Sequence, residues 1–98
     1  MKIIKRSGSE DIFDAAKIVA AIRKANDSVL DYEKLTADQI EEIASNVETA
    51  CENMKRSPSV EEIQDMVENQ LMNKRALTVA RNYITYRYKS CLLYTSDA

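Results

Sequence analysis

The sequence is poor in the residues that interrupt regular structure. Its 98 residues include one glycine, Gly8, and one proline, Pro58, where average usage gives roughly twelve of the two together. This shortage excludes a turn-rich β-sandwich or barrel, a Gly/Pro-rich linker and a collagen-like chain. We therefore expect one small, mainly α (α+β) domain with a core of modest size.

Histidine is absent, and cysteine occurs twice, at Cys51 and Cys91. Without histidine the chain has no conventional Ser/His or Cys/His catalytic pair, and one glycine cannot form a glycine-rich phosphate loop. Two isolated cysteines make neither a zinc site nor a disulfide framework, which favours a reducing, cytoplasmic setting. The chain shows no signal segment and no apolar run long enough to cross a membrane. We expect a cytoplasmic protein that has no membrane partner and is not an enzyme by itself.

Charge is unevenly distributed along the chain. The formal net charge is −2, but basic residues are in excess before residue 27 and after residue 70, and acidic residues are in excess between them. The net charge argues against a nucleic-acid partner bound through overall charge. If both ends meet in space, they form a basic face on an acidic body, which attracts a compact anion and repels a long polyanion.

Residues 2–13 have the pattern of a β-hairpin. Two β-prone stretches flank Ser7-Gly8, a two-residue turn in which Gly8 supplies the positive φ. A turn of this length pairs Ile3 with Ile12 and places both side chains on the same face. An isolated hairpin is marginally stable in water, so we expect it to pack against helices.

Four segments carry apolar residues at helical spacing. The first helix is expected from the N-cap Asp14 to about residue 26, and the second from the capping box that starts at Thr36. The third is expected from a second capping box at Ser59, and the fourth from about Arg75. The predicted architecture is an N-terminal β-hairpin packed on a small four-helix bundle. The inward positions are Ala15, Ile18, Val19, Ile22 and Ala25; Ile40, Ile43, Ala44, Val47, Ala50, Cys51 and Met54; Val60, Ile63, Met66, Val67 and Leu71; and Ala76, Leu77, Ala80, Tyr83, Ile84 and Arg87, with Val79 and Tyr86 beside the last group.

Three cations occur close together near the start of the chain. Lys5 and Arg6 adjoin the Gly8 turn, and Lys17 follows in the opening turn of the first helix. An arginine fork and two lysine charges beside the N–H groups of a helix N-terminus can hold phosphates without a P-loop. Basic residues also protect an exposed hairpin edge from aggregation, so the spacing alone leaves both interpretations open.

Four sequence blocks, taken in order, resemble an ATP-cone domain. They are Ile4-Lys5-Arg6-Ser7-Gly8, then Phe13-Asp14 with Lys17-Ile18, then residues 60–68 (VEEIQDMVE), then residues 79–87 (VARNYITYR). The similarity covers about residues 2–89 and is strongest to the N-terminal domain of anaerobic (class III) ribonucleoside-triphosphate reductases. We assign residues 1–90 to the cone and interpret 91–98 as a non-native tail, because that stretch looks like the translation of a sequencing adapter.

The resemblance implies a regulatory role. ATP-cones bind ATP or dATP away from the catalytic site and switch a ribonucleotide reductase on or off, respectively, and Mg²⁺ is expected with the triphosphate. They act by changing subunit contacts, which implies a nucleotide-dependent homo-oligomer whose catalytic domain is missing from this chain. No catalytic residue and no protein ligand for a metal is implied. The implied nucleotide-binding residues are Lys5, Arg6, Lys17 and Lys89 at the phosphates, Ile3 and Ile18 at the adenine, Asp11 and Asp14 at polar base or sugar groups, and Val60 and Gln64 facing the nucleotide from the third helix.

Other functions remain open at this point. The acidic middle and the amphipathic helices also suit a helical protein-interaction module without a ligand. A bacterial repressor of reductase genes carries an ATP-cone behind a zinc ribbon, although the ribbon cysteines are absent here. Aerobic class I reductases also carry N-terminal cones.

Overall fold

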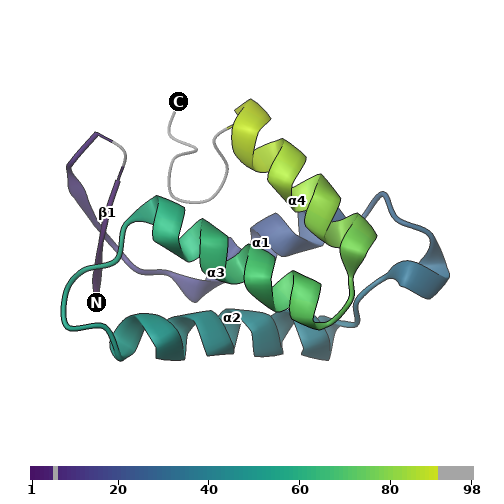
Figure 1. Cartoon of the computed structure of the whole chain (residues 1–98), viewed down its shortest axis with the longest axis horizontal. Coiled ribbons are helices and arrows are strands. Elements are labelled where there is room, and N and C mark those ends of the chain that lie inside the picture. The colour runs from purple at the N-terminus through teal and green to yellow at the C-terminus, as the bar shows by residue number, and fades with distance from the viewer. Residues whose placement is uncertain (6, 91–98) are drawn as a thin grey trace.

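The computed structural model describes residues 1–5 and 7–90, with side chains up to residue 87. In chain order it contains a two-stranded hairpin, helix α1, a short 3₁₀ segment η1, and helices α2, α3 and α4 (Figure 1). The expected hairpin and four helices are confirmed. Arg6, the side chain of Lys89 and the tail 91–98 lie outside the described part of the chain. Among the described residues, no helix is long and apolar enough to span a lipid bilayer.

The hairpin consists of β1 (Lys2–Ile4) and β2 (Glu10–Ile12), which run antiparallel. Ile3 lies opposite Asp11, so the predicted pairing of Ile3 with Ile12 is wrong by one residue. A shift of one residue moves a side chain to the other face of a strand. Ile3 is accordingly buried in the core, whereas Ile12 is 69% exposed.

The loop of the hairpin explains this shift. Lys5 N–H donates to the Ser9 carbonyl at 2.8 Å and Gly8 N–H donates to the Lys5 carbonyl at 2.8 Å, so three residues rather than two separate Lys5 from Ser9. Gly8 has a φ of 89°, the left-handed conformation that closes three-residue hairpin loops with a bulge. The prediction that Gly8 makes the turn is confirmed, but the loop is one residue longer.

Three helices begin where the sequence predicts: α1 (Ala15–Asn26), α2 (Ala37–Glu52) and α3 (Val60–Asn73). The Asp14 side chain caps α1, and Thr36 and Ser59 each form a complete capping box with the third helical residue. These side chains satisfy N–H groups that have no partner inside the helix. The caps therefore fix the residue at which each helix begins.

The last helix, α4 (Leu77–Ser90), begins two residues later than predicted. Arg75 N–H donates to the Met72 carbonyl at 2.9 Å and Ala76 N–H donates to the Leu71 carbonyl at 3.0 Å. These two bonds form the Schellman motif that ends α3, in which the left-handed residue is usually glycine. Here it is Arg75, with a φ of 60°, and α4 can begin only beyond it.

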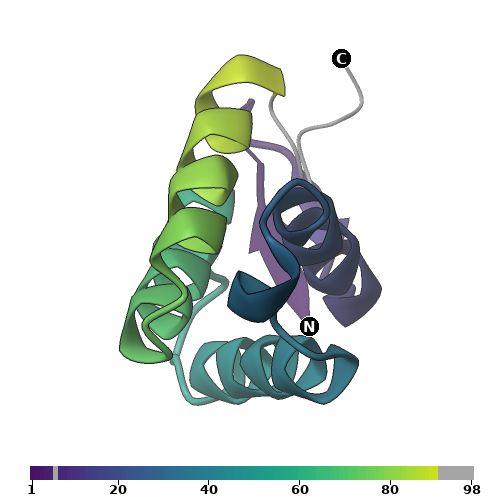
Figure 2. The same ribbon diagram turned by 90° about the vertical axis from the view of Figure 1, so that its right-hand side faces the viewer.

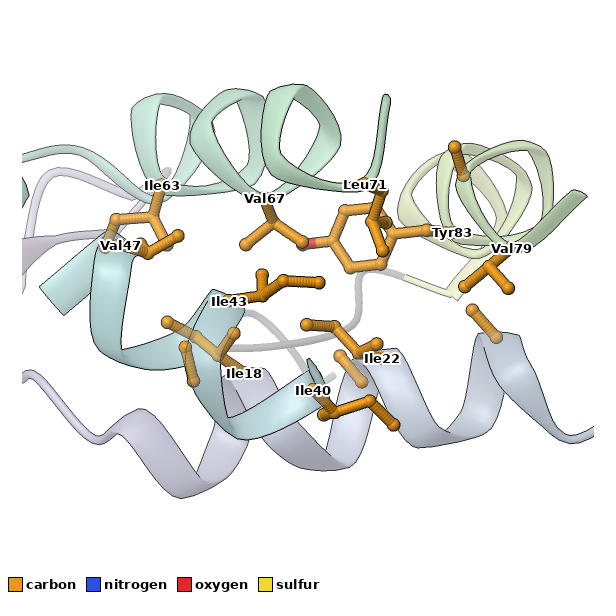
Figure 3. Packing of buried hydrophobic residues seen from close by; sticks show 14 of the residues in the cluster. Ile18, Ile22, Ile40, Ile43, Val47, Ile63, Val67, Leu71, Val79 and Tyr83 are labelled. Atoms are coloured by element: carbon orange, nitrogen blue, oxygen red, sulfur yellow. The ribbon is translucent and has the colours of Figure 1, made fainter. Parts of the chain in front are cut away.

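The four helices form a ring, because α1 and α3 each pack against both α2 and α4. Figure 2 shows α2 lying across one side of the ring, with the other helices over it. Apolar side chains from all four helices point into the enclosed space (Figure 3). The connection from α1 to α2 includes η1 (Asp31–Glu33), which the sequence did not predict. The Asn26 side chain holds this connection in place. Its Nδ2 donates to the Leu35 carbonyl at 3.1 Å, and its Oδ1 accepts from Leu35 N–H at 2.9 Å.

Most predicted inward positions are buried, but α4 is rotated from its predicted orientation. Leu77 is 56% exposed and Ile84 36% exposed, whereas Val79 is fully buried. Because α4 has apolar residues on both flanks of Tyr83, its sequence does not decide which flank faces inward. On α2, Ala50 is exposed. Other predicted inward residues are only partly buried, namely Ala15, Val19, Met54, Met66, Tyr86 and Arg87.

Candidate functional site

The hairpin, the start of α1 and the start of α3 meet at one end of the bundle (Figure 1). Ile4 N–H donates to the Pro58 carbonyl at 2.9 Å, and Ile4 forms a parallel bridge with Ser59, the N-cap of α3. On its other side the hairpin leads directly from β2 into α1. The predicted site residues of these three elements therefore lie at the same end of the molecule.

Three apolar residues predicted for the site are buried in the core. Ile3 of β1, Ile18 of α1 and Val60 of α3 belong to one buried cluster, and none of them is more than 1% exposed. They are packed as core residues and do not line an open cavity. A ligand can reach them only by displacing the side chains that cover them.

The polar residues predicted for the site are more accessible. The Asp11 carboxylate lies 3.8 Å from the Lys17 ammonium, and the two side chains are 37% and 43% exposed. Asp11 also accepts a hydrogen bond from Ile12 N–H at 2.8 Å. This ion pair connects β2 to the first turns of α1. Lys5 is half-buried at the base of the hairpin loop.

The N-terminus of α1 is capped by the carboxylate of Asp14, and that of α3 by the Ser59 hydroxyl in a capping box that includes the carboxylate of Glu62. Asp14 accepts from Ala16 N–H at 3.0 Å, which confirms its predicted N-cap role. At α3, Glu62 accepts from Ser59 N–H at 2.9 Å and binds the Arg56 guanidinium through both oxygens, at 2.8 and 2.5 Å. Arg56 and the Ser59 backbone lower the pKa of Glu62 to about 2. Because both N-termini already hold an anion, a phosphate at this end would be bound chiefly by lysine and arginine side chains.

Gln64 is a buried polar residue of α3 whose side chain forms no hydrogen bond within the described part of the chain. It follows Val60 by one turn of α3 and is fully buried, and neither Nε2 nor Oε1 has a hydrogen-bond partner within the described residues. A buried polar group without a partner costs about 1–3 kcal/mol. A carboxamide presents a donor and an acceptor side by side, so it can pair with the polar edge of a planar ligand.

Arg87 is predicted from the sequence to lie on the inner side of the last helix, and the sequence predicts no contact for it. Its guanidinium binds the carboxylate of Asp65 at 2.8 Å and that of Glu68, and its side chain is only 11% exposed. The signal that could have found this contact is an arginine on an inward stripe, with two acids three residues apart on the neighbouring helix. These ion pairs join the C-terminal half of α4 to α3.

The opposite flank of α4 is held to α1 by neutral and cation–π contacts. Asn82 Nδ2 donates to the Ala25 carbonyl and to Ser28 Oγ, both at 3.0 Å. The Lys24 ammonium lies 5.6 Å from the centre of the Tyr86 ring, within the range of a cation–π interaction. Two different kinds of contact therefore hold the two sides of this helix.

Cys51 is a free, buried residue of the core, as predicted. Burial, with the nearby Glu62 and other glutamates, raises the pKa of its thiol to about 11. A thiol is nucleophilic only as the thiolate, so the raised pKa disfavours reaction of Cys51 near neutral pH. Cys91 lies beyond the described residues.

Comparison with known protein families identifies the family to which this fold belongs. Residues 1–90 match the family model described as the ATP cone domain. The chain belongs to the ATP-cone family. The match spans the hairpin and all four helices of the cone, so the family resemblance of the four sequence blocks is confirmed.

The cone is similar to parts of several much longer proteins. It is 34% identical over 95 residues to the ribonucleoside-diphosphate reductase subunit alpha of Chlamydia trachomatis, covering 89% of the cone chain and 9% of that protein. It is 39% identical over 93 residues to the vitamin B12-dependent ribonucleoside-diphosphate reductase of Thermoplasma acidophilum, covering 90% and 12%. It is 34% identical over 87 residues to the anaerobic ribonucleoside-triphosphate reductase of Haemophilus influenzae, covering 88% and 12%. The chain thus spans about a tenth of the length of these relatives.

Proposed function

We propose that this cone binds ATP or dATP where the hairpin meets the starts of α1 and α3, and that it regulates a ribonucleotide reductase allosterically. The observation that carries the proposal is that Lys5, the Asp11–Lys17 ion pair and the buried residues Ile3, Ile18 and Val60 belong to elements that meet at one end of the bundle, within a chain of the ATP-cone family. Cations and apolar residues at the same end of the molecule suit a ligand that has a charged phosphate end and a flat apolar base.

The residues fit such a ligand in three respects. Lys5 and Lys17, with Arg6 and Lys89 from the family pattern, neutralise phosphate charge, and Arg6 offers a fork that can bind two oxygens. Asp11 and Asp14 can accept hydrogen bonds from sugar hydroxyls or base amino groups. The buried Gln64 amide, which lacks partners among the described residues, offers a further donor and acceptor.

The hairpin acts as the lid of the proposed site. Ile3 and Val60 are covered in the structure, so the base reaches them when β1 separates from the residues before α3. The main-chain attachment there includes the Ile4–Pro58 hydrogen bond, and one such bond contributes only about 1 kcal/mol net. Mg²⁺ would accompany the triphosphate, held mostly by phosphate oxygens and water.

The parent protein is proposed to be a ribonucleotide reductase, because the relatives named above are reductases. Their types differ and their identities are similar, at 34–39%, so the anaerobic type rests on the likeness of the four sequence blocks. The genomic sequence downstream of residue 89 tests this assignment. A glycyl-radical domain there supports the anaerobic type, and any other catalytic domain contradicts it.

We further propose that the intact protein is a homo-oligomer whose size depends on the bound nucleotide. Light scattering of the intact reductase with ATP and with dATP tests this. A different mass with each nucleotide is expected, and an identical mass would contradict it.

Calorimetric titration of the chain with ATP and dATP tests nucleotide binding directly. The double substitution Lys5→Ala, Arg6→Ala should weaken binding by about 2–5 kcal/mol, because two charge-assisted phosphate contacts are lost. The control is Lys34→Ala, Arg81→Ala, which removes the same charge from residues outside the proposed site. A folded wild-type chain that gives no heat with millimolar ATP or dATP would refute the function.

A further inference from the structure

The end of the bundle opposite the hairpin carries exposed apolar side chains. There η1 lies beside the turn that joins α3 to α4 (Figure 1). Tyr32 of η1 is 84% exposed, Leu77 of α4 is 56% exposed and Met72 of α3 is 52% exposed. Single exposed apolar residues are common on protein surfaces, but a group of them with a polar rim marks an interaction surface.

Two hollows that share Leu77 shape this part of the molecule, and we call them together the distal surface. One hollow, of about 360 Å³, lies between η1 and the start of α4, with Tyr32 and Leu77 in its lining. The other, also of about 360 Å³, follows α4 and is lined by Met72, Leu77 and Ile84. Leu77 and Ile84 are seven residues apart, about 10 Å along the helix. This spacing suits a helix that lies in a groove and inserts apolar side chains from successive turns.

The charges that line the distal surface are mostly positive. Glu33 is its one acid, and its cations are Lys34, Lys74, Arg75 and Arg81. Both lysines form ion pairs with carboxylates of the chain. Neither arginine side chain has an ion-pair partner among the described residues. Complementary charge on a partner would therefore be negative.

A second copy of the chain does not offer a surface with both properties. Helix α2 is rich in acids, but it has no exposed large apolar side chain. The hairpin exposes Ile4 and Ile12, but residues 2–12 contain three cations and two acids, so the hairpin brings no excess of negative charge. The distal surface therefore fits a different protein segment better than it fits another cone.

We propose that the distal surface binds an acidic amphipathic helix of a partner protein. The apolar stripe of that helix enters the two hollows on either side of Leu77. Its carboxylates lie against Arg75 and Arg81, whose guanidinium groups can bind a carboxylate through two hydrogen bonds. The proposal does not rest on the nucleotide binding proposed above, which is placed at the hairpin end of the bundle.

Two helical peptides of about five turns serve as probes. Both carry leucines at alternating three- and four-residue spacing, and the residues beside this stripe are glutamates in one peptide and lysines in the other. Each peptide is titrated by calorimetry into the wild-type chain, into Leu77→Glu, into the double variant Arg75→Glu, Arg81→Glu, and into Ile12→Glu. Ile12→Glu is the matched control, because it also replaces an exposed aliphatic residue by glutamate but lies on the hairpin. Unchanged melting temperatures show that the variants are folded.

Wild-type protein and Ile12→Glu should bind the glutamate peptide about tenfold or more tightly than the lysine peptide. Leu77→Glu should lose about tenfold or more of this affinity, because a charge replaces the central apolar contact. The double arginine variant should prefer the lysine peptide, an inversion that a merely apolar patch would not show. In NMR spectra the glutamate peptide should shift the amide signals of residues 72–85 most, and largest shifts on the hairpin would overturn the assignment.

Three further outcomes are decisive. If the wild type binds neither peptide, or binds both equally, the distal surface is not a site for an acidic helix. If the chain alone sediments as a dimer that Leu77→Glu abolishes, a second copy occupies the surface and the proposal fails. If the wild type prefers the glutamate peptide but gives no heat with ATP or dATP, the proposed function fails and the distal surface stands.

Discussion

The contribution of a single residue to the stability of this cone can depend on pH. Glu62 is the clearest case, because it binds Arg56 and completes the capping box of α3. Arg56 and the Ser59 backbone lower its pKa from 4.5 to about 2. A carboxyl with a lowered folded-state pKa stabilises the protein above its unfolded-state pKa, and this contribution is lost as the pH falls towards the folded-state pKa.

We therefore expect the contribution of Glu62 to disappear between about pH 4.5 and pH 2. Since its side chain is 35% exposed, solvent screening limits the loss to about 0.5–1 kcal/mol. Glu62→Gln keeps an amide for the capping box but removes the titration. Urea unfolding at pH 7, 4.5 and 2.5 should show a smaller acid-induced loss in this variant than in wild type, and equal losses would contradict the role of Glu62.

At the scale of elements, the sequence predicted best where a local rule decides the outcome. The caps at Asp14, Thr36 and Ser59 fixed three helix starts, because each depends on side chains within three residues of the helix end. The start of α4 was predicted two residues early, because a Schellman motif with Arg75 in place of glycine gives no compositional signal. The hairpin register was missed because a bulge at Gly8 adds one loop residue that the pattern of strand residues does not encode.

The candidate site was predictable only in part. The family pattern pointed to Ile3, Ile18 and Val60, and all three belong to the buried core of the fold. It could not show that all three are covered, because burial depends on how the hairpin closes over the helices. Nor could it show that Gln64 lacks hydrogen-bond partners among the described residues, since that depends on every neighbour in the core.

Replacing Gly8 tests the lid as an element. A Cβ added at Gly8 meets nothing within 4 Å, so the cost is that of a φ of 89° alone. Gly8→Ala should destabilise the hairpin by about 1 kcal/mol, and Gly8→Asn by less, because asparagine tolerates left-handed backbone. The amide of Lys5, which is bonded to Ser9, should then exchange hydrogen about fivefold faster in the alanine variant. Equal exchange in glycine and alanine proteins would show that the loop conformation is not limiting.

At the scale of the whole molecule, long-range polar contacts complement the shared core. The ring of helices closes where α4 meets α1 and α3. Arg87 connects α4 to acids that lie 19 and 22 residues earlier in the chain. Removing one partner of a largely buried ion pair leaves the other charges poorly solvated.

Arg87→Met should therefore lower the free energy of unfolding by about 1–3 kcal/mol. Arg81→Met is the control, because Arg81 is exposed on the same helix, and it should change stability by less than about 0.5 kcal/mol. Urea unfolding at neutral pH measures both. Equal losses of stability in the two variants would show that the ion pairs of Arg87 with Asp65 and Glu68 do not stabilise the fold.

The unlike contacts on the two flanks of α4 make its position sensitive to ionic strength. Salt screens the attraction of Arg87 for Asp65, whose side chain is 64% exposed, but hardly affects the neutral hydrogen bonds from Asn82 to α1. We therefore expect added salt to weaken the contact of α4 with α3 more than its contact with α1. The chemistry of the two contact surfaces would then set the direction in which this helix moves.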